Sequence, residues 1–246
     1  MLLFASVYPT GFCATMTALI KGPRGFARTG SLSGSLVGFV IGYVVLVVVL
    51  ALGRTHQLLT FEWPTFLPLL VLAPFAGLAC IALEYLVGVL ILYLRTKKLV
   101  TRVTIHSSYS VFPRIDVKDI LSVLAVVVGE ELVLRQFLYS LLADDLAIAV
   151  WLVILLCAVT YAINHLSFGA SSAISKLPSG LLYVWLFYIS GLSVAVVIVA
   201  HATQNLTLLG LSRRSSWLSN PRSWLSTPRS WLANRRSREV DNPRWH

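Results

Sequence analysis

The hydrophobic positions of this 246-residue chain fall into long runs that few charges interrupt. A run of roughly 17–25 apolar residues is long enough to cross the hydrocarbon core of a bilayer as a helix. We expect about seven such spans, over residues 2–20, 33–52, 65–94, 117–142, 146–169, 177–189 and 190–211. The sixth is short, so it should form a tight hairpin with the seventh or be re-entrant. The predicted fold class is all-α, a polytopic membrane helix bundle.

Composition supports the bilayer as the solvent of this chain. Hydrophobic residues make up 57% of the sequence and charged residues only 12%, whereas soluble domains carry roughly 25% charged residues. The formal net charge of +10 does not indicate nucleic-acid binding, because the basic residues lie between the apolar runs and in the tail. The three cysteines lie within apolar runs and form no CxxC pair. They therefore predict neither a disulfide framework nor a metal cluster.

The loop charges predict the orientation in the membrane. Basic residues follow the first and third spans, and Lys176 is expected in a loop on that same side. The loops on the other side are poor in basic residues and include Asp144 and Asp145. The positive-inside rule then leaves the N-terminus outside and the tail in the cytoplasm, with membrane lipids as partners.

A stripe of small residues crosses the second span. Gly30, Gly34, Gly38 and Gly42 recur every four residues, which lets another helix approach closely. The neighbour can belong to the same chain or to a second copy in a homo-oligomer. We favour packing within one chain.

The last residues form a seven-residue repeat, SWLSNPR, SWLSTPR and SWLANRR over 216–236. Trp favours the headgroup layer and Arg favours anionic lipid, so we interpret this tail as a membrane-hugging appendix. Docking of a partner or of nucleic acid is the alternative for the tail. The domains expected are N-terminal helices with a basic cytoplasmic loop (1–115), a core (116–211) and the repeat tail (212–246).

Charges inside predicted spans are expensive and tend to mark function. The fourth span contains Glu130, Glu131 and Arg135 in the string GEELVLR. Glu131 and Arg135 are four residues apart with the acid first, the favourable order for a helical ion pair. Glu130 is rotated by roughly 100° from Glu131. We therefore expect Glu131 to hold the arginine and Glu130 to be free for proton transfer.

Two later spans supply the remaining polar groups. His165 ends the string YAINH in the fifth span, and His201 and Asn205 lie one turn apart in the string HATQN of the seventh. At 1.5 Å per residue, all of these groups can meet in the cytoplasmic half of the membrane, provided that the fifth span stays helical toward residue 170.

Together these strings resemble the motifs of a known family. EELVLR (130–135), YAINH (161–165) and HATQN (201–205) are similar, in the same order, to the EExxxR, FxxxH and HxxxN motifs of the CAAX-protease and bacteriocin-processing (CPBP) family. This family is also called Abi or type II CAAX endopeptidases. The resemblance covers residues 116–211 and departs from the pattern at Tyr161, where the motif has Phe.

The resemblance implies an intramembrane endopeptidase that cuts a prenylated CAAX-type or leader-type peptide. Glu130 would activate water, His165 would assist, and His201 and Asn205 would bind the oxyanion, with Glu131 and Arg135 in support. Some family members are labelled metalloproteases, and Glu130, His165 and His201 could ligate zinc. We favour the mechanism that requires no cofactor, because a glutamate-activated water needs no ion.

Two other classes of function stay open. A non-catalytic multi-pass protein, such as an immunity protein, could bind a peptide in the same polar pocket. A proton-coupled transporter could use Glu130 and Glu84, an acid with no evident partner in the third span. The lack of an internal repeat of the span pattern disfavours transport.

Overall fold

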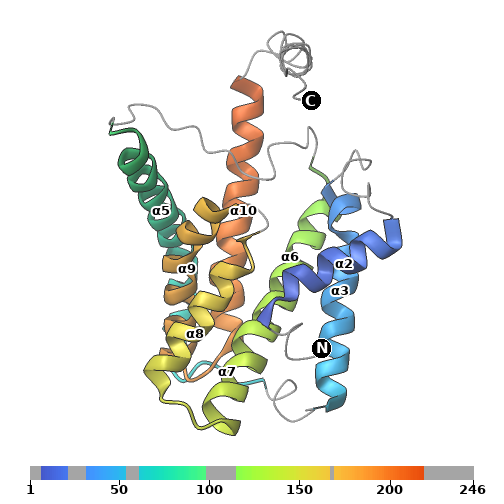
Figure 1. Ribbon diagram of the computed structural model, residues 1–246, viewed down its shortest axis with the longest axis vertical. Coiled ribbons are helices and arrows are strands. Elements are labelled where there is room, and N and C mark those ends of the chain that lie inside the picture. Colours follow the sequence, from blue (N-terminus) through green and yellow to red (C-terminus); the bar gives the residue numbers. More distant parts are fainter. Residues whose placement is uncertain (1–6, 22–31, 54–60, 98–114, 167–168, 219–246) are drawn as a thin grey trace, which may run out of the picture.

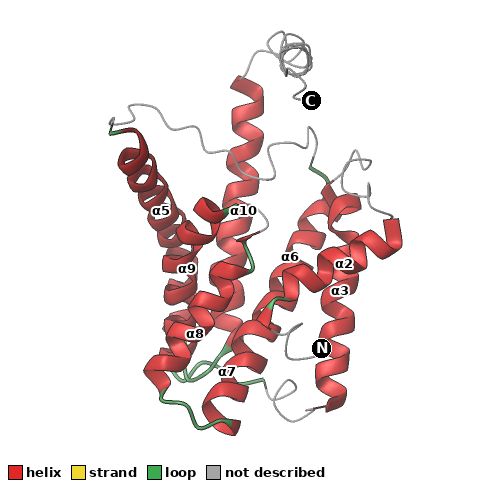
Figure 2. Ribbon diagram, in the orientation of Figure 1, coloured by secondary structure: helices red, strands yellow, loops and turns green. Residues whose placement is uncertain are grey.

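The computed structural model describes residues 7–21, 32–53, 61–97, 115–166 and 169–218. All regular elements within these ranges are helices (Figures 1 and 2), which confirms the all-α prediction. They form seven helical segments if the unbroken run from Val117 to Asp145 is counted as one. The other segments are α2 (Pro9–Lys21), α3 (Leu32–Gly53), α5 (Pro68–Thr96), α8 (Val150–Ile163), α9 (Ala170–Ile189) and α10 (Val194–Leu218).

The unbroken run is the central helix of the bundle. It consists of α6 (Val117–Glu131), the π-helical turn η2 (Leu132–Phe137), the short α7 (Leu138–Ser140) and a second π-helical turn, η3 (Leu141–Asp145). Residues 133–139 are all buried, so this part of the helix has neighbours on every side. π-Helical turns are rare and often mark functional sites. Here the first one begins directly after Glu131.

The central helix separates two groups of helices (Figure 1). On one side α2 and α3 pack against it, and Tyr43 and Leu46 share a core cluster with Val133 and Phe137. On the other side lie α8, α9, α10 and α5, whose core includes Leu134 and Tyr183 among its buried members. Residues of the central helix therefore contribute to both cores.

Glycines permit the closest contacts between helices. A Cβ on Gly38 would collide with Thr17, and one on Gly42 with Cys13, so α2 occupies this part of the glycine stripe. Packing within one chain, the favoured interpretation, accounts for these two positions. Gly30 lies outside the described residues, and a homo-oligomer through the stripe stays a prediction.

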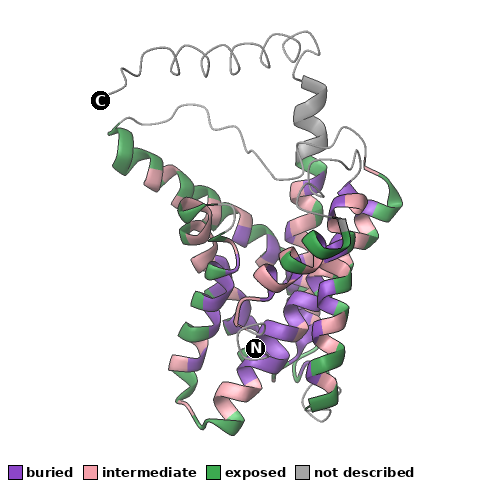
Figure 3. Cartoon of the chain, turned by 45° about the vertical axis from the view of Figure 1, so that its right-hand side comes forward, coloured by how far each residue is buried: buried purple, intermediate pink, exposed green. Residues whose placement is uncertain are grey.

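The outer surface is apolar, as a bilayer requires. Large hydrophobic side chains such as Leu52, Val71 and Trp151 are more than two-thirds exposed, and Figure 3 shows exposed positions along the outer faces of the helices. Three described helices, α3, α5 and the part of α10 up to Leu211, are long and apolar enough to cross a membrane. These features indicate an integral, multi-pass membrane protein, although seven spans are not confirmed.

The predicted sixth span was wrong in length. It was expected over residues 177–189, yet α9 begins at Ala170 and contains Pro178 in its interior. Lys176 therefore lies in the helix and not in a loop. A turn over residues 190–193 joins α9 to α10, with Gly191 at a φ of 75°. The expected hairpin between the last two spans is present.

Candidate active site

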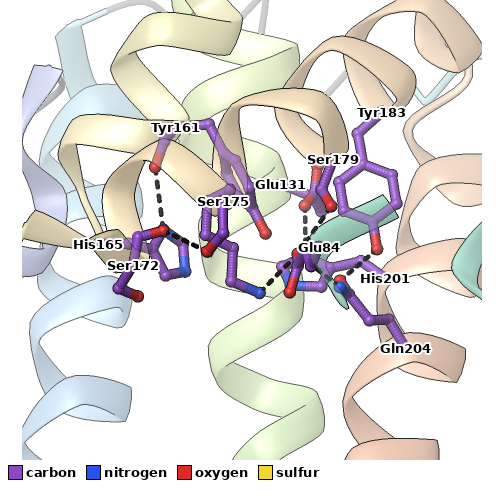
Figure 4. Close-up of polar contacts among 11 residues, drawn as sticks. Glu84, Glu131, Tyr161, His165, Ser172, Ser175, Ser179, Tyr183, His201 and Gln204 are labelled. Atoms are coloured by element: carbon purple, nitrogen blue, oxygen red, sulfur yellow. Dashed lines mark hydrogen bonds and ion pairs between the residues drawn. The ribbon is translucent and has the colours of Figure 1, made fainter. Parts of the chain in front are cut away.

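Glu131 is the centre of a fully buried polar cluster (Figure 4). Its Oε1 lies 2.6 Å from His201 Nδ1 and 3.3 Å from Arg135 Nη1, and its Oε2 lies 3.2 Å from Arg135 Nε. The pairing with Arg135 agrees with the helical spacing. The contact with His201, which lies 70 residues further along the chain, was not predicted, since Glu131 was expected to hold the arginine alone.

This contact determines which nitrogen of His201 is available for chemistry. An ionised carboxylate can only accept hydrogen bonds, so Nδ1 carries the hydrogen that points to Glu131. Nε2 is then the free ring nitrogen. It accepts a hydrogen bond in the neutral imidazole and donates one in the imidazolium.

Glu130 is also buried, with 7% of its surface exposed. It does not point into lipid. Its carboxylate lies within electrostatic reach of His201, Arg135 and Lys176, and on the other side it acts on Cys13 and Tyr43 of the N-terminal helices. Glu130 is thus enclosed between the two groups of helices, next to the Glu131 cluster.

His165 reaches the site from a turn and not from a helix. The α-helical part of α8 ends at Ile163, so the expected continuation of this helix toward residue 170 is not found. The His165 ring is instead held by its Nδ1, which lies 2.9 Å from the carbonyl oxygen of Tyr161, and by its contact with the Tyr161 ring, with centroids 4.8 Å apart.

Tyr161 links the two histidines. Its ring centroid lies 6.0 Å from that of His201, and the Arg135 guanidinium lies over its face at 4.5 Å. A cation over an aromatic face is attracted by the ring quadrupole. The three motifs are therefore brought together around one aromatic ring. From sequence this position was noted only as a mild departure from Phe.

Asn164, next to His165, connects the site to the N-terminal helix. Its Oδ1 accepts a hydrogen bond from Thr10 N at 3.0 Å, and its Nδ2 donates to Val7 O at 3.1 Å and to Thr160 O at 2.8 Å. The amide thus binds a free N–H in the first turn of α2. Sequence inspection had no signal for this bridge, because Thr10 and Val7 lie more than 150 positions away from Asn164.

Asn205 lies one turn beyond His201 on α10 and is half-buried. Among the described residues, the hydrogen bonds and ion pairs of Glu131, Arg135 and His201 join these three side chains to one another and do not involve Asn205. Its predicted role in binding an oxyanion stays a prediction.

Another carboxylate, the partly buried Glu84, forms its own cluster beside the first (Figure 4). Its Oε1 lies 2.8 Å from Lys176 Nζ and accepts hydrogen bonds from Ser179 Oγ and Gln204 Nε2, both at 2.7 Å. Gln204 in turn accepts a hydrogen bond from the Tyr183 hydroxyl at 2.6 Å. The expectation that Glu84 lacks a partner was therefore wrong. Lys176, assigned to a loop from sequence, is its counter-ion.

The described residues do not assemble a metal site. Among them, no group of three or more His, Cys, Asp or Glu side chains is arranged to hold an ion. The Nδ1 atoms of His201 and His165 already bind Glu131 and a backbone carbonyl. A histidine that ligates zinc through Nε2 usually donates its Nδ1–H to a carboxylate or a carbonyl, so these contacts do not decide the question. Zinc binding by Glu130, His165 and His201 stays a prediction.

Fold and site together define a membrane-embedded helix bundle with a buried carboxylate, histidine and arginine cluster. A family model described as type II CAAX prenyl endopeptidase Rce1-like matches residues 118–207. This is the family that the three motifs implied, and its members are intramembrane proteases. No curated protein and no solved structure matches the chain.

Proposed function

We propose that this protein is an intramembrane endopeptidase that hydrolyses a peptide bond near the membrane surface by means of a water molecule activated by Glu130. The observation that supports the proposal is the burial of Glu130 beside His201. The Nδ1 atom of His201 is bound to the Glu131 carboxylate, which leaves Nε2 for the substrate. A general base must be held within reach of the water that it deprotonates. A buried carboxylate beside oriented donors meets that requirement.

The proposed reaction proceeds through a tetrahedral intermediate. Glu130 takes a proton from water while the water oxygen forms a bond to the carbonyl carbon, and the carbonyl π electrons move onto oxygen. Nε2–H of His201 and the Asn205 amide would donate hydrogen bonds to this oxyanion. When the C–N bond breaks, Glu130 returns its proton to the leaving amine. His165 would position the water.

Glu131 and Arg135 act on this chemistry through His201. A carboxylate on Nδ1 fixes the ring orientation and stabilises the imidazolium, which makes Nε2 a better donor to an oxyanion. Arg135 offsets part of the negative charge of Glu131, so the anchor does not leave an uncompensated anion in the bundle.

The substrate class follows from the family alone. A prenylated peptide with a CAAX-type C-terminus is the first candidate, and a leader peptide of the bacteriocin type is the second. Both can be presented as reporter peptides to the purified protein in detergent or in vesicles.

The decisive experiment replaces Glu130 by Gln, which keeps the shape of the side chain and removes the base. We expect the rate of cleavage to fall by roughly 10²–10⁴-fold, the usual contribution of general base catalysis, and His201→Ala to reduce it comparably. Glu62→Gln is the matched control, because Glu62 is exposed. Dialysis against a strong chelator before the assay should leave cleavage unchanged.

Two outcomes would contradict the proposal. Full cleavage by Glu130→Gln would remove the assigned base. Tight peptide binding without any cleavage, in the natural protein and in Glu130→Gln alike, would favour the non-catalytic peptide-binding function.

A further inference from the structure

The hydroxyl of Tyr161 is buried without a hydrogen-bond partner. Tyr161 has no exposed surface, and its Oη makes no hydrogen bond within the part of the chain that the structure describes. The buried tyrosine beside it behaves differently, since the Tyr183 hydroxyl donates to Gln204. The centroids of the two rings lie 6.0 Å apart. The two tyrosines are therefore neighbours in the same environment, but only the Tyr183 hydroxyl has a hydrogen-bond partner.

A buried polar group without a partner destabilises a folded protein, because its lost hydration is not replaced. Such groups are rare and call for an explanation. Phe would fill the same space without this cost, and Phe is the residue that the family motif has at this position. The extra oxygen atom is therefore a specific property of this chain.

The surroundings of Tyr161 identify what its hydroxyl can bind. In Figure 4 the ring is directed into the middle of the cluster, with His165 on one side and Glu131 and His201 on the other. Glu130 is the charged group that acts most strongly on this phenol. A hydroxyl on a ring that lies beside both His165 and His201, within the electrostatic influence of Glu130, lies where the reacting atoms would be.

We propose that Tyr161 Oη donates a hydrogen bond to the oxyanion of the tetrahedral intermediate, beside Nε2 of His201. This inference rests on the proposed hydrolysis and adds a donor that the family motif lacks. No proton is transferred. The phenol keeps its hydrogen while the carbonyl oxygen becomes an anion, and the hydrogen bond strengthens as that charge develops.

The test is Tyr161→Phe, which deletes one oxygen atom and retains the ring under Arg135. We expect kcat for a farnesylated CAAX reporter peptide to fall on the order of 100-fold, as for removal of one oxyanion donor. KM should change less than about twofold, because the donor acts only on the developing charge. The thermal midpoint should rise by about 2–4 °C, since an unsatisfied group has been removed.

Two measurements distinguish a catalytic donor from a structural residue. A farnesylated peptide with a phosphonamidate at the scissile bond mimics the tetrahedral intermediate, and Tyr161→Phe should weaken its binding by the same factor as kcat. The unmodified peptide, measured in the Glu130→Gln background so that it stays intact, should bind equally with Tyr or Phe at this position.

Two other buried tyrosines, Tyr183 and Tyr139, provide matched controls. Tyr183→Phe breaks an existing hydrogen bond and should lower the thermal midpoint. Tyr139→Phe, at a ring that packs against Phe187 outside the cluster, should leave kcat unchanged. An unchanged kcat in Tyr161→Phe, or an equal loss of phosphonamidate and unmodified peptide binding, would overturn the inference. If Glu130→Gln is inactive while Tyr161→Phe is fully active, only this inference fails and the proposed function stands.

Discussion

Two carboxylates inside the bundle, the buried Glu131 and the partly exposed Glu84, bind similar partners in different ways. The Oε1 atom of each carboxylate contacts one basic side chain and at least one further hydrogen-bond donor. For Glu131 these are Arg135 and His201. For Glu84 they are Lys176, Ser179 and Gln204. The Glu131 side chain is entirely buried, whereas those of Glu84 and Lys176 are 15% and 14% exposed.

This difference in burial and in partners predicts which of the two carboxylates contributes more to the stability of the bundle. Arg135 forms a two-point contact with Glu131 and cannot lose its charge, so neither partner can be removed without leaving a buried ion. Lys176 is a flexible point charge that can turn toward solvent if its partner is lost. We therefore expect the first cluster to be intolerant of change and the second to be tolerant.

Glu131→Gln should have the largest effect on stability. It leaves the Arg135 charge buried and unpaired, a loss that typically costs 3–5 kcal/mol, and it also deprives His201 of its anchor. Thermal unfolding in detergent would measure the loss, and cleavage should be abolished. The double variant Glu131→Leu/Arg135→Met should recover much of the stability without activity. If Glu131→Gln unfolds at the same temperature as the natural protein, the Glu131 cluster is not the intolerant one, and the comparison with Glu84 is wrong.

Gly77→Ala tests the contact that joins the two clusters. Gly77 lies on the helix of Glu84, and a Cβ there would collide with the carbonyl oxygen of Ala200, next to His201. Separating α5 from α10 should cost about 1–3 kcal/mol and reduce cleavage. Gly88→Ala on the same helix is the control, since a Cβ there meets nothing within 4 Å. Equal behaviour of the two variants would exclude tight packing at Gly77.

Glu84→Gln should have the smallest effect. The Gln carbonyl oxygen can still accept the hydrogen bonds of Ser179 and Gln204, and Lys176 can reach solvent. We expect a loss of roughly 0.5–1.5 kcal/mol, the net contribution of an ordinary hydrogen bond, with kcat nearly unchanged. A loss as large as that of Glu131→Gln would mean that Glu84 belongs to the essential machinery.

The same comparison explains how far sequence inspection could reach. The pairing of Glu131 with Arg135 was predictable because it depends on the geometry of a single helix. The partners of Glu84 come from two other helices, 95 and 120 residues away for Ser179 and Gln204. Lys176 was misplaced because its charge suggested a loop, whereas burial beside a carboxylate makes a charge tolerable within a helix.

The role of Tyr161 could not be predicted either. Its sequence context identifies an aromatic position, but whether its hydroxyl has a partner depends on the packing of three helices. The predicted fifth span extended to residue 169, but the α-helix ends at Ile163, where the polar pair Asn164 and His165 follows. The overall all-α class was predictable, since long apolar runs leave few other solutions in a membrane.

The bridge between Asn164 and the first turn of α2 limits how the catalytic region can be transplanted. The family match begins at residue 118, yet the amide beside His165 binds Thr10 and Val7. A fragment that starts at the match would expose this amide and the surface of Gly129 that Tyr43 covers. The N-terminal helices should therefore accompany the motif region in any chimera, and, if they are expressed as a separate polypeptide, should restore a truncated enzyme by complementation.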